Sequence, residues 1–145
     1  MTRSFHRSIS RRLIDALSTA GINRGIGPSQ RYLLTVAGRK THTPHTTPVS
    51  VVTDGAARYL VGPYGEVGWV LNAREAGIVT LSRRGRTERF SLVPIKAAEA
   101  GPILKRYLKL EPITKPYFEV SVDAPAEAFG ALAATHPVFM LTPAT

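Results

Sequence analysis

The sequence predicts an α+β fold in which hairpin-linked strands form a small antiparallel barrel with helices around it. The expected order is a helix, three strands, a short helix, a hairpin, and then helix, strand, helix and strand. Strands joined by hairpins, with helices between them, are typical of this class, whereas a doubly wound parallel sheet alternates strand and helix from its start. A chain of 145 residues suits one domain with its own core.

Composition and charge exclude some kinds of functional site and favour some kinds of binding partner. The chain has no cysteine, which excludes disulfides, thiolate metal sites and a cysteine nucleophile, and fits a reducing cytoplasm. Its net charge is +9, and residues 1–40 hold eight basic residues against one acid. Such a basic segment favours an anionic partner, which could be nucleic acid, an acidic bilayer surface or a polyanionic small molecule.

The first twenty residues predict an amphipathic helix. Apolar residues recur at spacings of three and four, opposite a stripe of arginines. The apolar face comprises Phe5, Ile9, Leu13, Ala16, Leu17 and Ala20, and the stripe comprises Arg3, Arg7 and Arg11. Glycines between residues 21 and 28 end this pattern, so we expect a basic N-terminal helix and linker over 1–27 and a barrel domain over 28–145. The helix could lie on an acidic bilayer, cap the barrel or pair with a second subunit.

Beyond Pro28 the apolar pattern changes to that of strands. Turn signals separate the segments: Asp54-Gly55 predicts a hairpin, Gly62-Pro63 ends a strand, Gly77 ends a helix, and Arg83 to Arg86 form a second hairpin turn. The predicted strands cover 32–36, 46–53, 58–61, 78–82, 88–93, 117–122 and 138–141. The predicted helices cover 66–76, 97–110 (with a potential break at Gly101-Pro102) and 126–135.

Two segments have residues suited to binding an anion. The loop after the first strand places Arg39, Lys40 and several threonines together, and arginine and lysine both bind phosphate or carboxylate. A solvated basic loop is the equal alternative on composition alone. The second segment, 62–72, is rich in glycine and leads into a helix whose N-terminal N–H groups suit anions. Its Trp69 could border a planar ring or simply pack in the core.

These two segments together resemble the deazaflavin-dependent nitroreductase family. The sequence Gly-Arg-Lys-Thr-x-x-Pro-x-x-Thr-Pro spans Gly38 to Pro48, and Trp-x-x-Asn spans Trp69 to Asn72. Members of this family are split β-barrel proteins of actinobacteria, related in architecture to FMN-binding proteins, and they use coenzyme F-420. The resemblance covers about residues 30–95.

The resemblance implies a binding role for each segment. By position, Arg39, Lys40 and Thr41 would hold the phosphodiester and glutamate tail of the coenzyme, with His45 where many members have a basic residue. The deazaflavin ring would run along the second strand, and the glycine loop would form a second phosphate site beside Trp69 and Asn72. The remaining implied residues are Thr47, Pro48, Val49 and Ser50 on the strand, and Gly62, Pro63, Tyr64 and Gly65 in the loop.

The expected reaction is hydride transfer from the reduced deazaflavin to an activated alkene, enone, quinone or nitro compound, because the coenzyme supplies the chemistry. No catalytic residue is assigned, since the family's C-terminal tyrosines have no counterpart in 129–142. FMN is the less favoured cofactor. A non-catalytic deazaflavin or fatty-acyl-binding protein at the membrane surface is the alternative function, and a homodimer is possible for either. We expect no metal, because His42 and His45 lack further ligands, and no nucleic-acid partner.

Overall fold

We describe residues 22, 28–118 and 120–144 of a computed structural model of the chain. The helix predicted over the first twenty residues lies outside these, so its existence and the proposed division at residue 27 stay predictions. The observed strands can be compared with those predicted from the sequence. Each of the six strands observed overlaps one that the sequence predicts.

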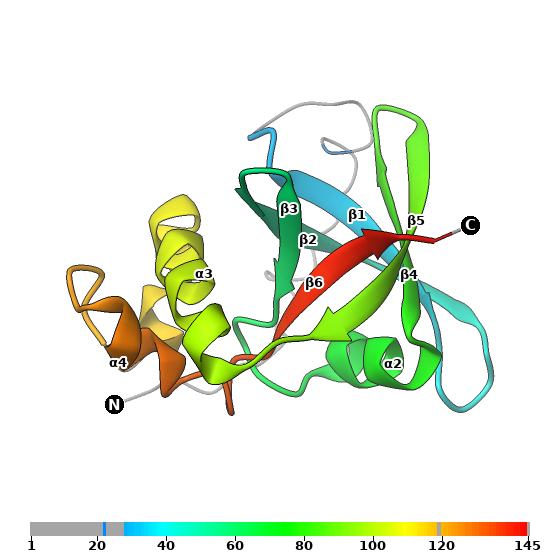
Figure 1. Cartoon of the computed structure of the whole chain (residues 1–145). Helices are drawn as coiled ribbons and strands as arrows, with labels where there is room; N and C mark the ends of the chain where they lie inside the picture. Colours follow the sequence, from blue (N-terminus) through cyan, green and yellow to red (C-terminus); the bar gives the residue numbers. More distant parts are fainter. Residues whose placement is uncertain (1–21, 23–27, 119, 145) are drawn as a thin grey trace.

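Six strands form a closed antiparallel barrel in the order β1-β2-β3-β6-β5-β4 (Figure 1). The ring closes because β1 pairs with β4 as well as with β2, and every pair is antiparallel. This confirms the predicted barrel. The strands are β1 (Arg31–Ala37), β2 (Pro44–Asp54), β3 (Ala57–Val61), β4 (Ile78–Arg83), β5 (Arg86–Pro94) and β6 (Val138–Pro143).

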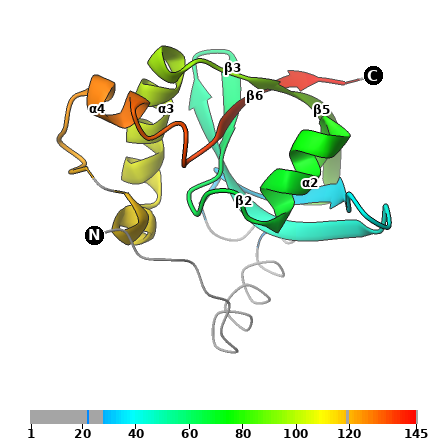
Figure 2. The same cartoon turned by 90° about the horizontal axis from the view of Figure 1, so that it is seen from below.

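The helices lie outside the barrel on two sides. α2 (Gly68–Ala76) crosses one end of the ring, where Figure 2 shows it in front of the barrel opening. α3 (Ala97–Leu110) and the short α4 (Ala126–Gly130) pack together to one side, next to β3 (Figure 1). α3 continues through Gly101-Pro102 without a break. A 3₁₀ helix, η1 (Pro112–Tyr117), follows it.

Alternate residues of the strands supply two separate hydrophobic cores. Val51 and Leu60 point into the barrel, where they meet Phe90 and the α2 residue Ala73. Their neighbours Val52 and Val61 belong to the second core, between the barrel wall and α3 with α4. This division follows from the two-residue period of a strand, which turns successive side chains to opposite faces.

β2 changes its partner strand halfway along its length. It pairs with β1 from Pro44 to Ser50, but β3 pairs with it only from Val51 to Asp54. The N–H of Val51 donates to the carbonyl of Gln30, beside β1. Strand alternation therefore turns the N–H groups of Ser50 and Thr46 to the opposite edge, which has no partner strand among the described residues.

Two predictions for the C-terminal third were wrong. The described residues of 117–122 form no strand: Tyr117 ends the 3₁₀ helix, and a turn joins Ser121 to Ala124. The apolar residues of this stretch, from Phe118 to Val122, pack against the second core from an irregular segment. Pro116 has no N–H for a strand ladder, which disfavours pairing there. The helix predicted over 126–135 ends at Gly130 and continues as turns.

Alanine substitutions at two helical glycines should distinguish the effect of packing on the free energy of unfolding from the effect of helix propensity. A Cβ at Gly101 would overlap the carbonyl oxygen of Ala126, where α3 and α4 touch, whereas a Cβ at Gly68 would meet no atom within 4 Å. We therefore expect Gly101→Ala to lower the free energy of unfolding by about 1 to 3 kcal/mol. Gly68→Ala should leave it unchanged or raise it slightly. Urea denaturation measures both, and equal stabilities would contradict the close contact of the two helices.

Candidate functional site

A cavity of about 1100 Å³ extends along β2 from the β1–β2 loop to the end of α3. Its wall comes from the β1–β2 loop, the segment before α2 with the first turns of that helix, and the end of α3. Twelve of the fourteen residues proposed from the sequence line it: Arg39, Lys40, Thr41, His45, Thr47, Pro48, Val49, Ser50, Pro63, Tyr64, Trp69 and Asn72. The fold therefore brings two segments that are distant in sequence to one cavity.

One end of the cavity is cationic, and a buried amide fixes its geometry. The side-chain oxygen of Asn72, on α2, accepts hydrogen bonds from the backbone N–H of Arg39 at 3.1 Å and from its Nη1 at 2.7 Å. Asn72 thus ties the β1–β2 loop to α2. Lys40 is exposed and forms no ion pair among the described residues. The loop therefore offers its positive charge to a ligand rather than to a carboxylate of the chain.

The N-terminus of α2 opens onto the same end. Gly68 and Trp69 line the cavity, the residue before them makes no side-chain capping bond, and the first turn has no acidic residue. The first N–H groups of a helix lack partners within it and attract anions. With Arg39 and Lys40 opposite, this end of the cavity suits a phosphate or carboxylate group.

Gly62 and Gly65 do not line the cavity, contrary to expectation. The N–H of Gly62 donates to Pro137 at 2.8 Å, and the N–H of Gly65 donates to the carbonyl of Gly62 at 3.2 Å. Gly65 has a φ of 85°, which favours glycine, and it closes the turn. These two glycines shape the loop, and their N–H groups are already used within the chain. The free donors at this end are instead those of the α2 N-terminus.

Trp69 lies between the cavity and the barrel core. It lines the cavity and also packs against the barrel core. The imidazole ring of His45 lies close to Gly38, where a Cβ would come within 2.9 Å of its Nε2 and 3.2 Å of the carbonyl oxygen of Thr43. The close approach explains the glycine at the start of this loop. His45 lines the cavity beside the cationic residues.

The opposite end of the cavity has a polar group that sequence patterns did not reveal. Arg31, the first residue of β1, donates from Nε and Nη2 to the carboxylate of Glu111, with distances of 3.1 to 3.2 Å. Glu111 follows the last residue of α3 and is buried. Tyr107 and Thr114 complete this end with the exposed Ile113. The contributing elements are some eighty residues apart in the chain, so no local motif marks them.

Tyr107 is a neutral phenol in this setting. Burial raises its pKa above the usual range, and the nearby Tyr64 and Glu111 raise it further. Tyr64 also packs edge to face on Tyr117, with ring centroids 4.6 Å apart. His136 is buried. Its Nε2 lies 2.6 Å from the carbonyl oxygen of Tyr117, and it does not line the cavity.

Comparisons with known proteins identify the fold and the family. Residues 13–119 match the family model of the F420H2-dependent quinone reductases. An F420-H2-dependent reductase, FDR-A, has a similar structure, with a TM-score of 0.55 and 13% identity over 78% of this chain and 94% of that chain. A structure described as a domain-swapped dimer has a TM-score of 0.57 and 16% identity, covering 92% of this chain and 93% of its own.

A solved structure of a protein with a different description has a similar fold. A pyridoxamine 5'-phosphate oxidase-like protein from Listeria innocua matches with a TM-score of 0.50 and 15% identity, over 88% of this chain and 92% of its own. No curated protein matches the sequence closely enough to count as a relative. These structures support the split-barrel fold, and the family model covers most of the chain. The chain therefore belongs to the F420H2-dependent quinone reductase family, and it is an oxidoreductase that uses coenzyme F-420.

Proposed function

We propose that the protein reduces a quinone with a hydride from reduced coenzyme F-420, which it binds lengthwise in the cavity along β2. The observation that carries this proposal is the polarity of that cavity. One end combines Arg39, Lys40 and the N-terminus of α2, while the middle is a strand edge without a partner strand. A long acidic tail attached to a flat ring matches this arrangement in charge and in shape.

The cationic end would hold the phosphodiester and glutamate tail. Arg39 is already oriented by Asn72, so little side-chain freedom is lost when an anion binds. Lys40 adds a point charge, and Thr41 adds a hydroxyl group. The N–H groups of Gly68 and Trp69 would take the place that the glycine loop was expected to fill.

The ring would lie along β2, from Thr47 to Ser50. Thr46 and Ser50 direct their N–H groups to the open edge and can donate to the polar margin of a ring. Pro48 has no N–H to leave unsatisfied there. Trp69 lines the same space and can contact the flat face of the ring.

When bound and reduced, the deazaflavin supplies the hydride, so the residues of this chain need only hold the reactants in place and exclude water. A ring held in a fixed position would favour direct transfer to an acceptor lying against it. The quinone class follows from the family to which the chain belongs. A homodimer and a peripheral contact of residues 1–20 with an acidic membrane remain further proposals. Within the described residues, no helix is long and apolar enough to span a membrane.

The proposal is tested by titrating the purified protein with coenzyme F-420 while following the fluorescence of Trp69, its only tryptophan. FMN serves as the control, because it lacks the long acidic tail. We expect saturable binding of F-420 that weakens as salt rises, and turnover of a soluble quinone by the reduced complex. Equal binding of FMN, or none of either, would contradict the assignment.

Lys40→Ala should weaken coenzyme binding by about 1 to 3 kcal/mol, because it removes one charge-assisted contact with the tail. The same titration measures this loss, and its salt dependence should also become shallower. Lys109→Ala, an exposed cation on α3 that does not line the cavity, is the matched control. An affinity of Lys40→Ala equal to that of the control would place the tail elsewhere.

Asn72→Asp should separate the structural role of this residue from its electrostatic effect. The carboxylate can still accept both hydrogen bonds from Arg39, so we expect nearly unchanged stability. Its negative charge opposes the anionic tail, and coenzyme affinity should fall by about 1 to 2 kcal/mol.

Asn72→Ala provides the comparison for that prediction, because it leaves the N–H of Arg39 without its partner. It should lower the free energy of unfolding by about 1 to 3 kcal/mol. Thermal unfolding and the F-420 titration measure the two effects separately. If Asn72→Asp and Ala variants behaved alike in both assays, Asn72 would not hold the loop as described.

A further inference from the structure

We propose that Arg31 binds an oxygen of the acceptor at the end of the cavity away from the cationic loop, and that Glu111 positions its guanidinium group. This inference rests on the proposed function, since it assigns the place where the acceptor meets the coenzyme. It concerns residues from the start of β1 and the end of α3, which neither the sequence motifs nor the family match singles out.

The Arg31–Glu111 pair is rigid on the carboxylate side. The Glu111 side chain is only 7% exposed, and it accepts three hydrogen bonds from Arg31. Its own backbone is fixed as well. The Glu111 N–H bonds to Tyr107, and its carbonyl accepts the Thr114 hydroxyl at 2.7 Å. The end of α3 therefore determines where the guanidinium group lies.

One side of Arg31 remains available to a ligand. Nε and Nη2 are directed at Glu111, whereas Nη1 forms no hydrogen bond among the residues that the structure describes. The side chain is 40% exposed and lines the cavity. A half-exposed guanidinium held on one side and open on the other is a preorganised donor for a single oxygen.

The position of Arg31 fits the acceptor rather than the tail. Arg31 lies directly opposite Ser50 in the β1–β2 register, on the β1 side of the last residue of the segment proposed for the ring. Gly38 starts the cationic loop seven residues further along, which corresponds to about 23 Å at about 3.3 Å per strand residue. A coenzyme that places its tail at Lys40 would bring its ring toward Arg31.

Positive charge at this position matches the charge that the reaction creates. A hydride released by breaking a C–H bond of the reduced deazaflavin would form an O–H bond at one quinone oxygen, the quinone ring would become aromatic, and the negative charge would rest on the other oxygen. The quinone is thereby reduced to a hydroquinone monoanion, the coenzyme is oxidised, and water supplies the final proton. Arg31 would stabilise the anionic oxygen, while the neutral phenol of Tyr107 adds no opposing charge.

The test is a binding measurement that needs no turnover. Protein saturated with oxidised F-420 is titrated calorimetrically with a hydroxynaphthoquinone that is ionised at neutral pH, and with the uncharged naphthoquinone. Saturation with F-420 occupies the cationic end, so binding of the hydroxynaphthoquinone anion reports on the rest of the cavity. We expect the wild type to prefer the anion by about tenfold and Arg31→Gln to lose this preference. An unchanged preference in Arg31→Gln would overturn the proposal.

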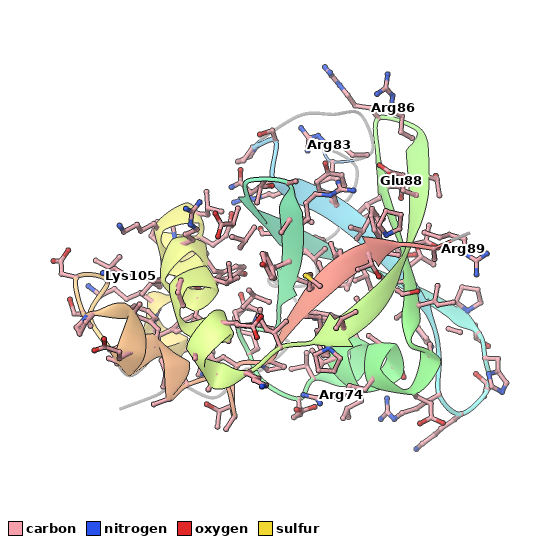
Figure 3. All side chains as sticks on the ribbon, in the orientation of Figure 1. Arg74, Arg83, Arg86, Glu88, Arg89 and Lys105 are labelled. Carbon is pink, nitrogen blue, oxygen red and sulfur yellow. The ribbon has the colours of Figure 1, made fainter. Side chains whose placement is uncertain are left out.

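Further variants distinguish binding from simple structural support. The double variant Arg31→Gln with Glu111→Gln removes both charges, so no unpaired buried carboxylate remains, and it should also lack the preference. Glu111→Gln keeps the guanidinium but loosens it, and should lower kcat for the quinone more than it changes KM. Arg86→Gln removes a cation at the tip of the β4–β5 hairpin, away from α2 (Figure 3), and should behave like the wild type.

The two proposals can fail independently. A wild-type protein that does not bind F-420 refutes the proposed function. A protein that binds F-420 normally but shows no preference for the anion refutes only the role of Arg31. If Arg31→Gln weakened F-420 binding as much as Lys40→Ala does, Arg31 would belong to the tail site, and the acceptor assignment would be overturned.

Discussion

The eleven residues of β2 serve two partner strands in succession, and the site depends on that division. β1 pairs with the first seven residues, and β3 pairs with the last four. The far edge of the first stretch is therefore left with backbone groups that face a cavity instead of another strand. A barrel closed along its whole length would have no such edge. The ligand proposed here would act as the missing strand, which is a general mode of recognition by sheets.

Two polar links hold the ends of this cavity, and both join an arginine at a terminus of β1 to a helix. Asn72 of α2 holds Arg39, just after β1, and Glu111 at the end of α3 holds Arg31, its first residue. The two helices pack on separate hydrophobic cores, α2 on the barrel interior and α3 on its outer wall. The packing of each core thus sets the position of one cation relative to β2.

Local chemistry made most of the fold and one end of the site predictable. Asp54-Gly55 and the arginine-rich turn marked two hairpins, and Arg39, Lys40 and Asn72 stood out through their residue types and spacing. The other end of the site was not predicted, because Arg31 and Glu111 are eighty residues apart and only the packing of α3 brings them together. The strand predicted over 117–122 failed for a related reason. Its apolar residues pack against α3 from an irregular segment, and burial alone does not distinguish such a segment from a strand.

Hydrogen exchange at individual amides of β2 tests most directly whether the coenzyme lies along the open strand edge. The N–H groups of Thr46 and Ser50 face that edge, whereas that of Val51 is already bonded to Gln30. Saturation with F-420 should slow exchange at Thr46 and Ser50 and leave Val51 unchanged. Saturable binding with no protection at either amide would place the coenzyme elsewhere and contradict the arrangement described.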